Sequence, residues 1–472
     1  MITDDIKTAF PELDLSNVGD YFSEHIAAWK KIYEGKPKWS ETKKTGLYAK
    51  GNRPLNMLNA AKVLADELTA LVFSEQVDIF VDDEKIMEYV TQQLENNGFW
   101  KNIIELLPKA FALGGCAFKV FVKNKKVGIE YIHADRFMPI EWNGKTVTSA
   151  VIEGKFTRSG HFYTLFEYHK GGKVEYRLFC SDNSESIGKK VSISEVLSEF
   201  PETVDYGADI PMFVYFKPAV SNNVEYDTPL GMSVFANATD TLKAIDVTFD
   251  SLSREVVLGK KRIIVPSQTL TQYYDQKSKS WVQAYDTDDE AYVAFNSDDA
   301  ETLKITDNTT DLRIQEHIDA INAQLNILCF QTGLSAGSLS FDTVNGLKTA
   351  TEVVSQESKT QRTVRNNKNL ITETLEELVQ AIIVVGRFLE ELPSGDMPDI
   401  TIGWNDNVII DDNTMIENTI KLYNAGLLDL KTAVMRANKC DEETAGKLAE
   451  RIKAEQSVGS ADFFGDNPKT EE

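Results

Sequence analysis

The chain has 472 residues, which is too long for one compact core, so we expect three or more structural units. Its hydrophobic content of 42% and aromatic content of 10% are those of a folded protein. The formal net charge of −23 argues against tight, static binding of DNA, because that needs a basic face, but it allows an acidic surface that DNA slides past without adhering.

The cysteines and the apolar stretches indicate neither a disulfide framework nor a membrane span. The four cysteines lie far apart and form no CxxC pair: Cys116, Cys180, Cys329 and Cys440. Without a recognisable secretory leader, we expect them to be buried thiols in a reducing compartment. The densest apolar stretch, Leu378 to Leu389, contains Gly386 and Arg387, so we expect it to be too short and too charged to cross a bilayer.

The first half of the chain changes its hydrophobic period from that of a helix to that of a strand. Residues 1–103 look helical, with amphipathic runs over Lys50–Phe73 and Glu84–Asn97. Alternating residues then predict strands at Ala117–Val122, Val127–Ile132, Val147–Phe156, His161–Tyr168 and Val174–Phe179. Turn residues at Lys123–Lys125 and Gly171–Gly172 join neighbouring strands, so we expect an antiparallel sheet.

Three seven-residue apolar repeats follow, and each alternates steps of three and four residues. They are Phe235, Ala238, Leu242, Ile245, Phe249, Leu252 and Val256; then Ile314, Ile318, Ile321, Leu325 and Leu328; then Ile371, Leu375, Leu378, Ile382, Val385 and Leu389. This spacing predicts helices over about 232–258, 312–332 and 349–391, each with one narrow apolar seam. Because such seams usually pack against copies of the same chain, we expect a self-associating strut. Gly259 takes the place of a C′ glycine at the end of the first helix.

A β-rich insertion separates the first two of these helices, and a loop separates the second from the third. We expect strands in the insertion at Arg262–Val265, Trp281–Tyr285 and Ala291–Phe295. The insertion also carries an acidic cluster: Asp286, Asp288, Asp289, Glu290, Asp298, Asp299 and Glu301. This cluster is either a solvated face or a docking surface for a basic partner. A short strand at Ile400–Trp404, a small helical bundle and a polar tail from Ser457 complete the chain.

Catalytic patterns are present in the sequence but lack their required context. Gly333-Leu334-Ser335-Ala336-Gly337 matches G-x-S-x-G, yet a helix precedes the serine and all five histidines come earlier in the chain. The end of the same loop, Gly346-Leu347-Lys348-Thr349, lacks the Gly-Lys pair of a phosphate-binding loop. Histidine spacing suggests no metal ligands. We therefore expect no enzymatic activity, no cofactor and no metal.

The first half of the third helix is basic, with Lys359, Arg362, Arg365 and Lys368. Arg362 and Arg365 have two interpretations: ion pairs with acids of a neighbouring copy, or contact with a phosphate backbone. We favour pairing between copies, because the acidic chain supplies many partners.

Three stretches, taken in chain order, carry the residues of one known family. They are Lys62 to Glu75, with Ala65-Asp66-Glu67-Leu68; Asp240 to Val265, with Ile245-Asp246 and Phe249-Asp250; and Gly346 to Val353. The ordered set spans nearly the whole chain. It resembles the portal proteins of tailed bacteriophages, of the type found in phages of Gram-positive bacteria.

The resemblance implies a dodecameric ring at one capsid vertex, in the virion and, during assembly, in the host cytoplasm. Double-stranded DNA would enter through its channel during packaging and leave through it at ejection. Expected partners are further copies of the chain, the terminase, a head-completion or adaptor protein, and the major capsid and scaffolding proteins, but no membrane. A minor structural head protein without a channel is an alternative, and a serine hydrolase using Ser335 is a remote one.

The resemblance also implies an α+β fold with a helical stem, a β-rich clip, a mixed wing containing an antiparallel sheet, and a helical crown. The parts would be a helical portion of the wing (1–103), a β-rich portion of the wing (104–230), stem helices (231–258 and 312–332), clip (259–311), tunnel loop (333–348), long helix with return strand (349–412), crown (413–456) and a disordered acidic tail (457–472).

Candidate site residues follow from these parts. The expected channel lining is Ser338, Ser340, Phe341, Asp342, Asn345 and Lys348. Expected contacts between copies are Ile245, Phe249, Leu252, Ile318, Ile321, Leu325, Arg362 and Arg365. The expected docking surface for the motor or adaptor is Trp281, Asp286, Asp288, Asp289 and Glu290. Because the loop offers few cations, DNA should slip past it, with Lys348 as the exception.

Overall fold

The computed structural model describes most of the chain, and its contacts divide the chain into two units. The described residues are 3–16, 21–43, 52–73, 77–197, 200–259, 263–266, 271–275, 279–284, 292–295, 306–307, 311–340, 350–404, 412–438 and 445–452. One unit comprises Met1–Ser74 with Asp78–Gly403, and the other comprises Glu75–Val77 with Trp404–Glu472. Both helices and strands are abundant, so the α+β fold class is confirmed.

The larger sheet has the strand order β10-β9-β8-β7-β6, with β11 paired to β9, and all of these pairs are antiparallel. Its strands are β6 (Phe137–Asn143), β7 (Thr146–Arg158), β8 (His161–Lys170), β9 (Lys173–Ser181), β10 (Lys189–Val191) and β11 (Thr203–Asp205). The predicted turn at Gly171–Gly172 is confirmed, since Lys170 pairs with Lys173 and Gly171 has a φ of 55°. Helix α1 (Thr3–Ala9) covers this sheet with the buried Ile6 and, just after it, Phe10.

The single antiparallel sheet expected from the sequence is in fact two sheets. The smaller one has the order β12-β4-β5, from Phe213–Phe216, Cys116–Lys123 and Lys126–His133. The predicted hairpin turn is confirmed, because Asn124 and Lys125 both have positive φ, as a two-residue turn between twisted strands requires. Helix α5 (Phe99–Leu113) enters β4 through Gly114, whose φ is 89° and whose added Cβ would lie 2.6 Å from the Gly231 carbonyl oxygen.

Four further helices of this unit pack against α5 or the small sheet. They are α2 (Tyr21–Tyr33), α3 (Ala60–Val72), α4 (Glu84–Asn96) and α9 (Ala350–Phe388). The second half of α9 packs against β12, β4 and α3. Val379, Ala381 and Ile383 are fully buried together with the heptad positions, so this part of α9 is enclosed on several sides. The expected narrow seam facing another copy is therefore wrong for α9, which is a core helix of its own chain.

Short strands also occur in the segments that looked helical or irregular. β1 (Glu41–Lys43) pairs with β2 (Asn52–Pro54), and β3 (Val77–Val81) pairs with β18 (Ile400–Trp404). The strand at Ile400–Trp404 was expected, whereas its partner was not. The three-residue strands β1 and β2 are too short to show a hydrophobic period.

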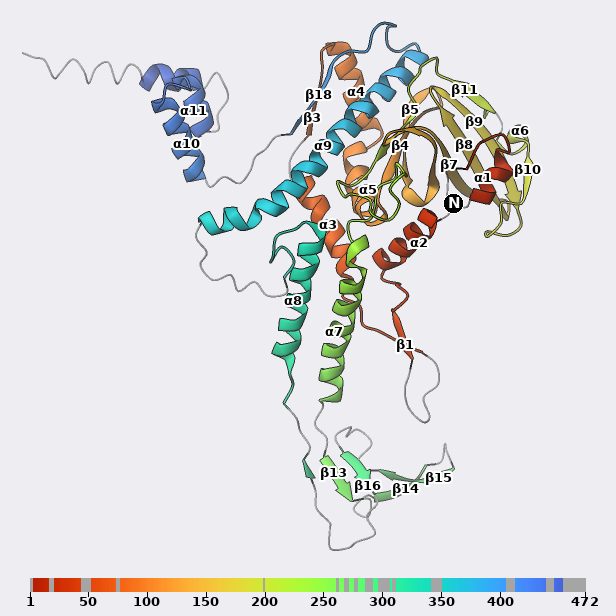
Figure 1. The fold of residues 1–472 in the computed structure, drawn as a ribbon, viewed down its shortest axis with the longest axis vertical. Helices are drawn as coiled ribbons and strands as arrows, with labels where there is room; N and C mark the ends of the chain where they lie inside the picture. The colour runs from red at the N-terminus through yellow and green to blue at the C-terminus, as the bar shows by residue number, and fades with distance from the viewer. Residues whose placement is uncertain are drawn as a thin grey trace, which may run out of the picture. The chain divides into compact units, whose positions relative to one another are not determined.

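Helices α7 (Thr239–Leu258) and α8 (Ile314–Thr332) lie side by side in opposite directions, with the insertion between them (Figure 1). The insertion contains β13 (Ile263–Pro266), β14 (Thr271–Asp275), β15 (Ser280–Ala284), β16 (Tyr292–Phe295) and β17 (Thr306–Asp307). β13 pairs in parallel with β16 and antiparallel with β17, and β14 pairs with β15. The β-rich insertion is thus confirmed. Gly259 ends α7, but its φ of −80° shows that it does not take the left-handed conformation expected of a C′ glycine.

The second unit is helical where the sequence predicts helices. It contains α10 (Asp412–Asn424), α11 (Leu430–Asn438) and a helical segment at 445–452. Gly426, with a φ of 69°, lies in the turn after α10. The tail 457–472 lies outside the described residues. Among the described residues, no helix has an apolar stretch sufficient to span a bilayer.

Candidate functional site

Helices α7 and α8 pack against each other along their apolar seams, inside one chain. Leu242, Ile245, Ile321 and Leu328 are almost fully buried there. Two hydrogen bonds also join the helices beside this seam. Thr241 Oγ1 donates to Gln331 Oε1 at 2.8 Å, and Gln324 Nε2 donates to Thr248 Oγ1 at 3.1 Å. At the end nearest the insertion, the Arg313 guanidinium binds both carboxylate oxygens of Glu255 at 3.0 Å and lowers the pKa of Glu255.

Because the seam is buried within one chain, some of the residues predicted to contact another copy have little exposed surface for such a contact. Ile245, Ile321 and Leu325 are enclosed by their own chain, because the insertion lets α7 and α8 fold back onto each other. Little of their surface is left for a neighbouring copy. Phe249, Leu252 and Ile318 are only half-buried, and a contact with another copy stays a prediction for these three.

Two carboxylates of α7 fasten the segment around the β1–β2 hairpin to the helix pair. Trp39 Nε1 donates to Asp246 Oδ2 at 2.9 Å, and the Leu58 amide donates to Asp246 Oδ1 at 3.1 Å. Arg53 donates two hydrogen bonds to Asp250, at 2.8 and 2.6 Å. Hydrogen bonds from Arg53 lower the pKa of Asp250, whereas burial raises the pKa of Asp246. In the sequence, these two acids stand four residues apart beside an apolar seam, so they share one face of the helix. Their role became clear only from the position of the hairpin in the structure.

Asp250→Ala should release the hairpin from α7. The variant leaves Arg53 and the Asn56 amide without their acceptor, so we expect a loss of about 2–3 kcal/mol in the free energy of unfolding, less than for a fully buried pair because Arg53 is partly exposed. Urea denaturation measures this loss. The control is Asp66→Ala, which breaks an exposed i,i+4 pair with Lys62 and should cost less than about 0.5 kcal/mol. Equal losses of unfolding free energy in the two variants would show that Asp250 does not hold the hairpin on α7.

The start of the loop between α8 and α9 is held firmly. Gly333 has a φ of 84° and ends α8, and its carbonyl oxygen accepts from Thr363 Oγ1 at 2.7 Å. The Gly337 amide donates to Asn326 Oδ1 at 2.8 Å. Leu339 is buried. The loop therefore leaves the helix pair from a fixed base.

The predicted channel residues fall on both sides of the limit of the described chain. Ser338 is half-buried and Ser340 is exposed at the end of the fixed base. Phe341, Asp342, Asn345 and Lys348 lie outside the described residues, so their role in lining a channel stays a prediction.

Ser335 is a structural residue of this loop base. Its side chain is buried, its amide donates to Thr360 Oγ1 at 2.9 Å, and its hydroxyl accepts from the Thr360 amide at 3.3 Å. Within the described chain no histidine is a hydrogen-bond partner of Ser335. The G-x-S-x-G match thus serves to dock the loop onto α9.

The basic first half of α9 lies next to the exposed end of α8. Lys359 Nζ lies 4.3 Å from the centre of the Phe330 ring and donates to the Phe330 carbonyl oxygen at 2.7 Å. Arg362 and Arg365 are exposed, and Arg362 Nε donates to the Ser358 carbonyl oxygen at 3.4 Å. Both arginines are therefore accessible to acids of another copy, as expected, but this pairing stays a prediction.

Most of the predicted docking residues of the insertion lie outside the described residues. Trp281 lies on β15, but its side chain is outside the described part. Asp286, Asp288, Asp289 and Glu290 lie entirely outside the described residues. Their docking role stays a prediction.

A buried ionic cluster, not foreseen from the sequence, joins the two sheets. Lys119 of β4 lies 2.8 Å from Glu167 of β8 and 2.5 Å from Glu130 of β5. His169 Nε2 lies 3.5 Å from Glu167 Oε2. Burial alone would lower the pKa of Lys119, but Glu167 and Glu130 outweigh it and raise that pKa. The same burial would raise the pKa of Glu167, but Lys119 and His169 outweigh it and lower it. The cluster is internally paired, as buried charges must be.

His169 should make the stability of the chain depend on pH. Burial lowers its pKa, so the folded chain keeps the imidazole neutral while the unfolded chain protonates it near about pH 6.5. The unfolded state then binds more protons, so the free energy of unfolding falls as the pH drops below that value. His169→Phe should reduce this slope by up to about 1.4 kcal/mol per pH unit, measured by urea denaturation from pH 7.5 to 5. Thr164→Val, on the same strand and without a titratable group, is the control and should keep the wild-type slope.

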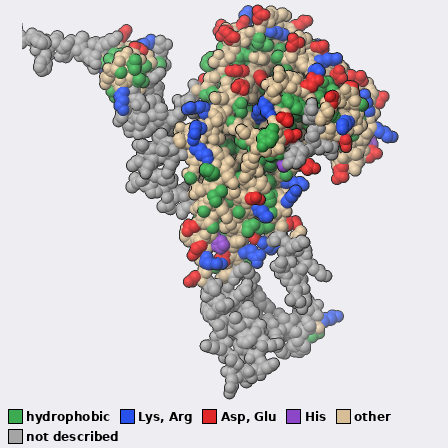
Figure 2. Space-filling model, in the orientation of Figure 1, with side chains coloured by type: hydrophobic (Ala, Val, Ile, Leu, Met, Phe, Trp, Pro, Cys, Tyr) green, Lys and Arg blue, Asp and Glu red, His purple; other side chains and the backbone are tan. Residues whose placement is uncertain are grey.

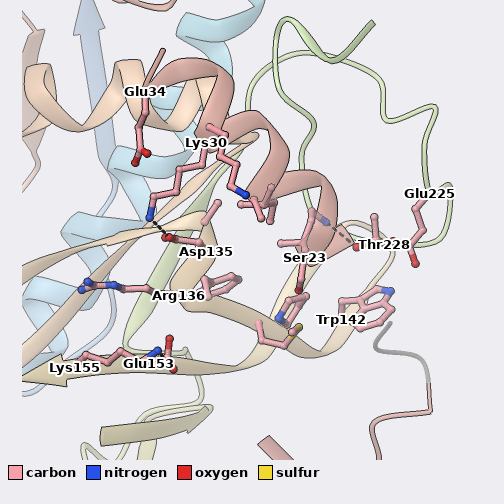
Figure 3. Close-up of a pocket in the computed structure, with 18 residues that line it drawn as sticks. Ser23, Lys30, Glu34, Asp135, Arg136, Trp142, Glu153, Lys155, Glu225 and Thr228 are labelled. Carbon is pink, nitrogen blue, oxygen red and sulfur yellow. Dashed lines mark hydrogen bonds and ion pairs between the residues drawn. The ribbon is translucent and has the colours of Figure 1, made fainter. Parts of the chain in front are cut away.

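A hollow of about 510 Å³ lies between α2 and the larger sheet (Figure 3). Lys30 reaches from α2 to Asp135 at 2.6 Å, and Lys155 lies 3.0 Å from Glu153. Burial would raise the pKa of Asp135, but the hydrogen bond from Lys30 outweighs it and lowers that pKa. Because these charges neutralise one another in pairs, the hollow lacks the excess charge of an ionic ligand site.

Comparison with known proteins decides the family. Residues 15–458 match the family described as "Phage portal protein, SPP1 Gp6-like". The chain belongs to this phage portal family. No curated protein matches the chain significantly. The portal resemblance seen in the sequence is thereby confirmed over nearly its whole length.

Membership of the portal family makes the chain a structural component of a phage capsid and implies a homo-oligomeric ring. A structural role for the chain agrees with two features described above: Ser335 holds the loop base against α9, and Lys119 pairs with carboxylates of its own chain. Among the described residues of this portal-family chain, no group of three or more His, Cys, Asp or Glu is placed to hold a metal ion.

Proposed function

We propose that the chain forms a ring-shaped channel at one capsid vertex, through which double-stranded DNA enters during packaging and leaves at ejection. The observation that carries the proposal is the match to the portal family over residues 15–458. The helix pair α7–α8, which leaves and returns around a β-rich insertion, supports it, because it supplies a rigid rod with a module at its end.

The parts of the chain have distinct roles in this proposal. Helices α7 and α8 form the stem, residues 259–311 the clip, residues 333–348 the tunnel loop and residues 413–456 the crown. The clip docks the terminase during packaging and the head-completion protein afterwards, and the ring contacts the major capsid and scaffolding proteins. The chain itself does no chemistry, since a separate ATPase supplies the work.

The charge of the chain supports passage without adhesion. On the face that Figure 2 shows, acidic side chains are scattered over the described part of the chain, and basic ones are interspersed with them. A net charge of −23 repels phosphates on average, which favours sliding over binding. Arg362 and Arg365 pair with acids of a neighbouring copy in this arrangement.

Electron microscopy of the purified chain tests the proposal. We expect rings with a central hole wide enough for a duplex, with twelve copies in the assembled head. Particles without a hole would instead indicate a minor structural head protein, and a chain that stays monomeric even in infected cells would overturn the proposal.

A further inference from the structure

The outer face of α7 carries two cations, the acid Asp240 and an apolar side chain, and it borders an open hollow. Lys243, Val247 and Arg254 are exposed and follow one another at steps of four and seven residues, so they lie on one face of the helix. They line a hollow of about 780 Å³ beside the β1–β2 hairpin. Within the described part of the chain, neither Lys243 nor Arg254 has an ion-pair partner, while Asp250 and Glu255 are already bound by Arg53 and Arg313.

The outer face of α8 has the opposite character. Glu316, Asp319, Ile327 and Phe330 are exposed and lie at helical spacing along one face. Phe330 is 75% exposed and Ile327 is 50% exposed, and at a spacing of three residues they form an apolar patch on this face. The acidic residues occupy the end of α8 near the insertion, and the apolar residues occupy the other end.

Three contacts between the helices fix the relative heights of their residues. Thr241 lies level with Gln331, Thr248 with Gln324, and Glu255 with His317. Each step of seven residues along α7 therefore matches a step of seven residues back along α8. By the same count, Lys243 is level with Cys329, Val247 with Leu325 and Arg254 with Ile318.

The exposed residues at equal heights are chemically complementary. Moving from the loop end to the insertion end, the exposed pairs within about 3 Å in height include Lys243 with Phe330, Val247 with Ile327, and Arg254 with Asp319. These are a cation with an aromatic ring, an apolar pair and an ion pair. Pairing of α7 with α7 across a two-fold axis would instead bring like charges together. The complementarity thus favours contact between two different faces.

We propose that neighbouring copies in the ring dock the α8 face of one copy into the hollow beside the α7 face of the next. The inference rests on the proposed ring. A rotation about the ring axis produces no shift along that axis, so helices that run near-parallel to it keep their heights and bring the complementary residues together. The contact is heterologous, which is the type that closes a ring. It replaces the buried seam as the surface that joins copies of the stem.

Cysteine cross-linking tests the pairing. In a Cys180→Ser and Cys440→Ser background, where the remaining Cys116 and Cys329 are buried, a Val247→Cys chain is mixed with an Ile327→Cys chain before assembly. We expect an oxidised dimer from the mixture and none from either chain alone. A mixture of the Val247→Cys and Glu316→Cys chains is the control and should not cross-link, because their heights differ by about 13 Å, beyond the reach of a disulfide.

Charge reversal gives a second readout. Arg254→Glu and Asp319→Arg should each lower the yield of rings by roughly tenfold or more, and the double variant should restore it. Lys85→Glu, an equal charge change on exposed α4, should keep the wild-type yield. Rings that form without the 247–327 cross-link, or a dimer from the Val247→Cys chain alone, would overturn this inference and leave the proposed channel standing. Absence of rings from the wild-type chain would instead remove the proposed function.

Discussion

Ile321→Asp should collapse the helix pair within each chain, before any ring can form. Ile321 is fully buried in the apolar seam between α8 and α7. A carboxylate in this seam has no cation or hydrogen-bond donor to compensate the loss of water, so we expect a loss on the order of 4–5 kcal/mol in the free energy of unfolding. Urea denaturation followed by circular dichroism measures it. Ring loss follows as a secondary effect, since the faces that we propose to join copies depend on the pair.

The control for this variant lies two positions along the same helix. Ala323 is exposed within one chain, so Ala323→Asp should leave the free energy of unfolding within about 1 kcal/mol of wild type. If Ile321→Asp denatures like the wild type and only the rings disappear, the seam joins copies instead of helices of one chain. That result would reinstate the interpretation drawn from the heptad spacing.

Deleting residues 341–344 should leave rings intact and abolish most DNA packaging. The deletion starts after the fixed base of the loop, where Leu339 is buried and Gly337 is bonded to Asn326, so α8 and α9 keep their contacts. It removes Phe341 and Asp342, which we propose to line the channel. Electron microscopy of the rings and the fraction of DNA-filled heads in infected cells measure the two effects separately.

A deletion of equal length in the tail, residues 461–464, is the matched control and should change neither measurement. Unimpaired packaging by the 341–344 deletion would remove the channel-lining role from this part of the loop. Loss of rings would show that the loop also joins copies, which the structure of its base does not indicate.

The long elements were predictable because their hydrophobic periods are strong. The five strands from Ala117 to Phe179 and the helices at α7, α8 and α9 all lie within a few residues of their predicted bounds, except at the start of α7. Helix α7 begins at Thr239, after a short 3₁₀ turn, instead of near residue 232. The three-residue strands β1 and β2 were missed, since a segment this short has no measurable period.

The candidate site was predicted less completely than the fold. Arg362 and Arg365 are exposed, and their contact with another copy stays a prediction. Asp246 and Asp250 were noted only as part of a family resemblance, and their role in holding the hairpin was not foreseen, because the residues that bind them are nearly two hundred positions away. Lys119, Glu167 and His169 were missed for the same reason, since they meet only where the two sheets pack.

The sequence by itself determined helices α7 and α8, the β-rich insertion between them and the portal family, because periodicity and ordered motifs are local or linear properties. It did not determine which surface each apolar seam faces. Only the tertiary structure decided that, by folding α8 back onto α7 and enclosing Ile245 and Ile321 within one chain. A heptad repeat records that a helix needs an apolar partner, but the partner's identity depends on which helix the chain brings near, and this is a property of the whole fold.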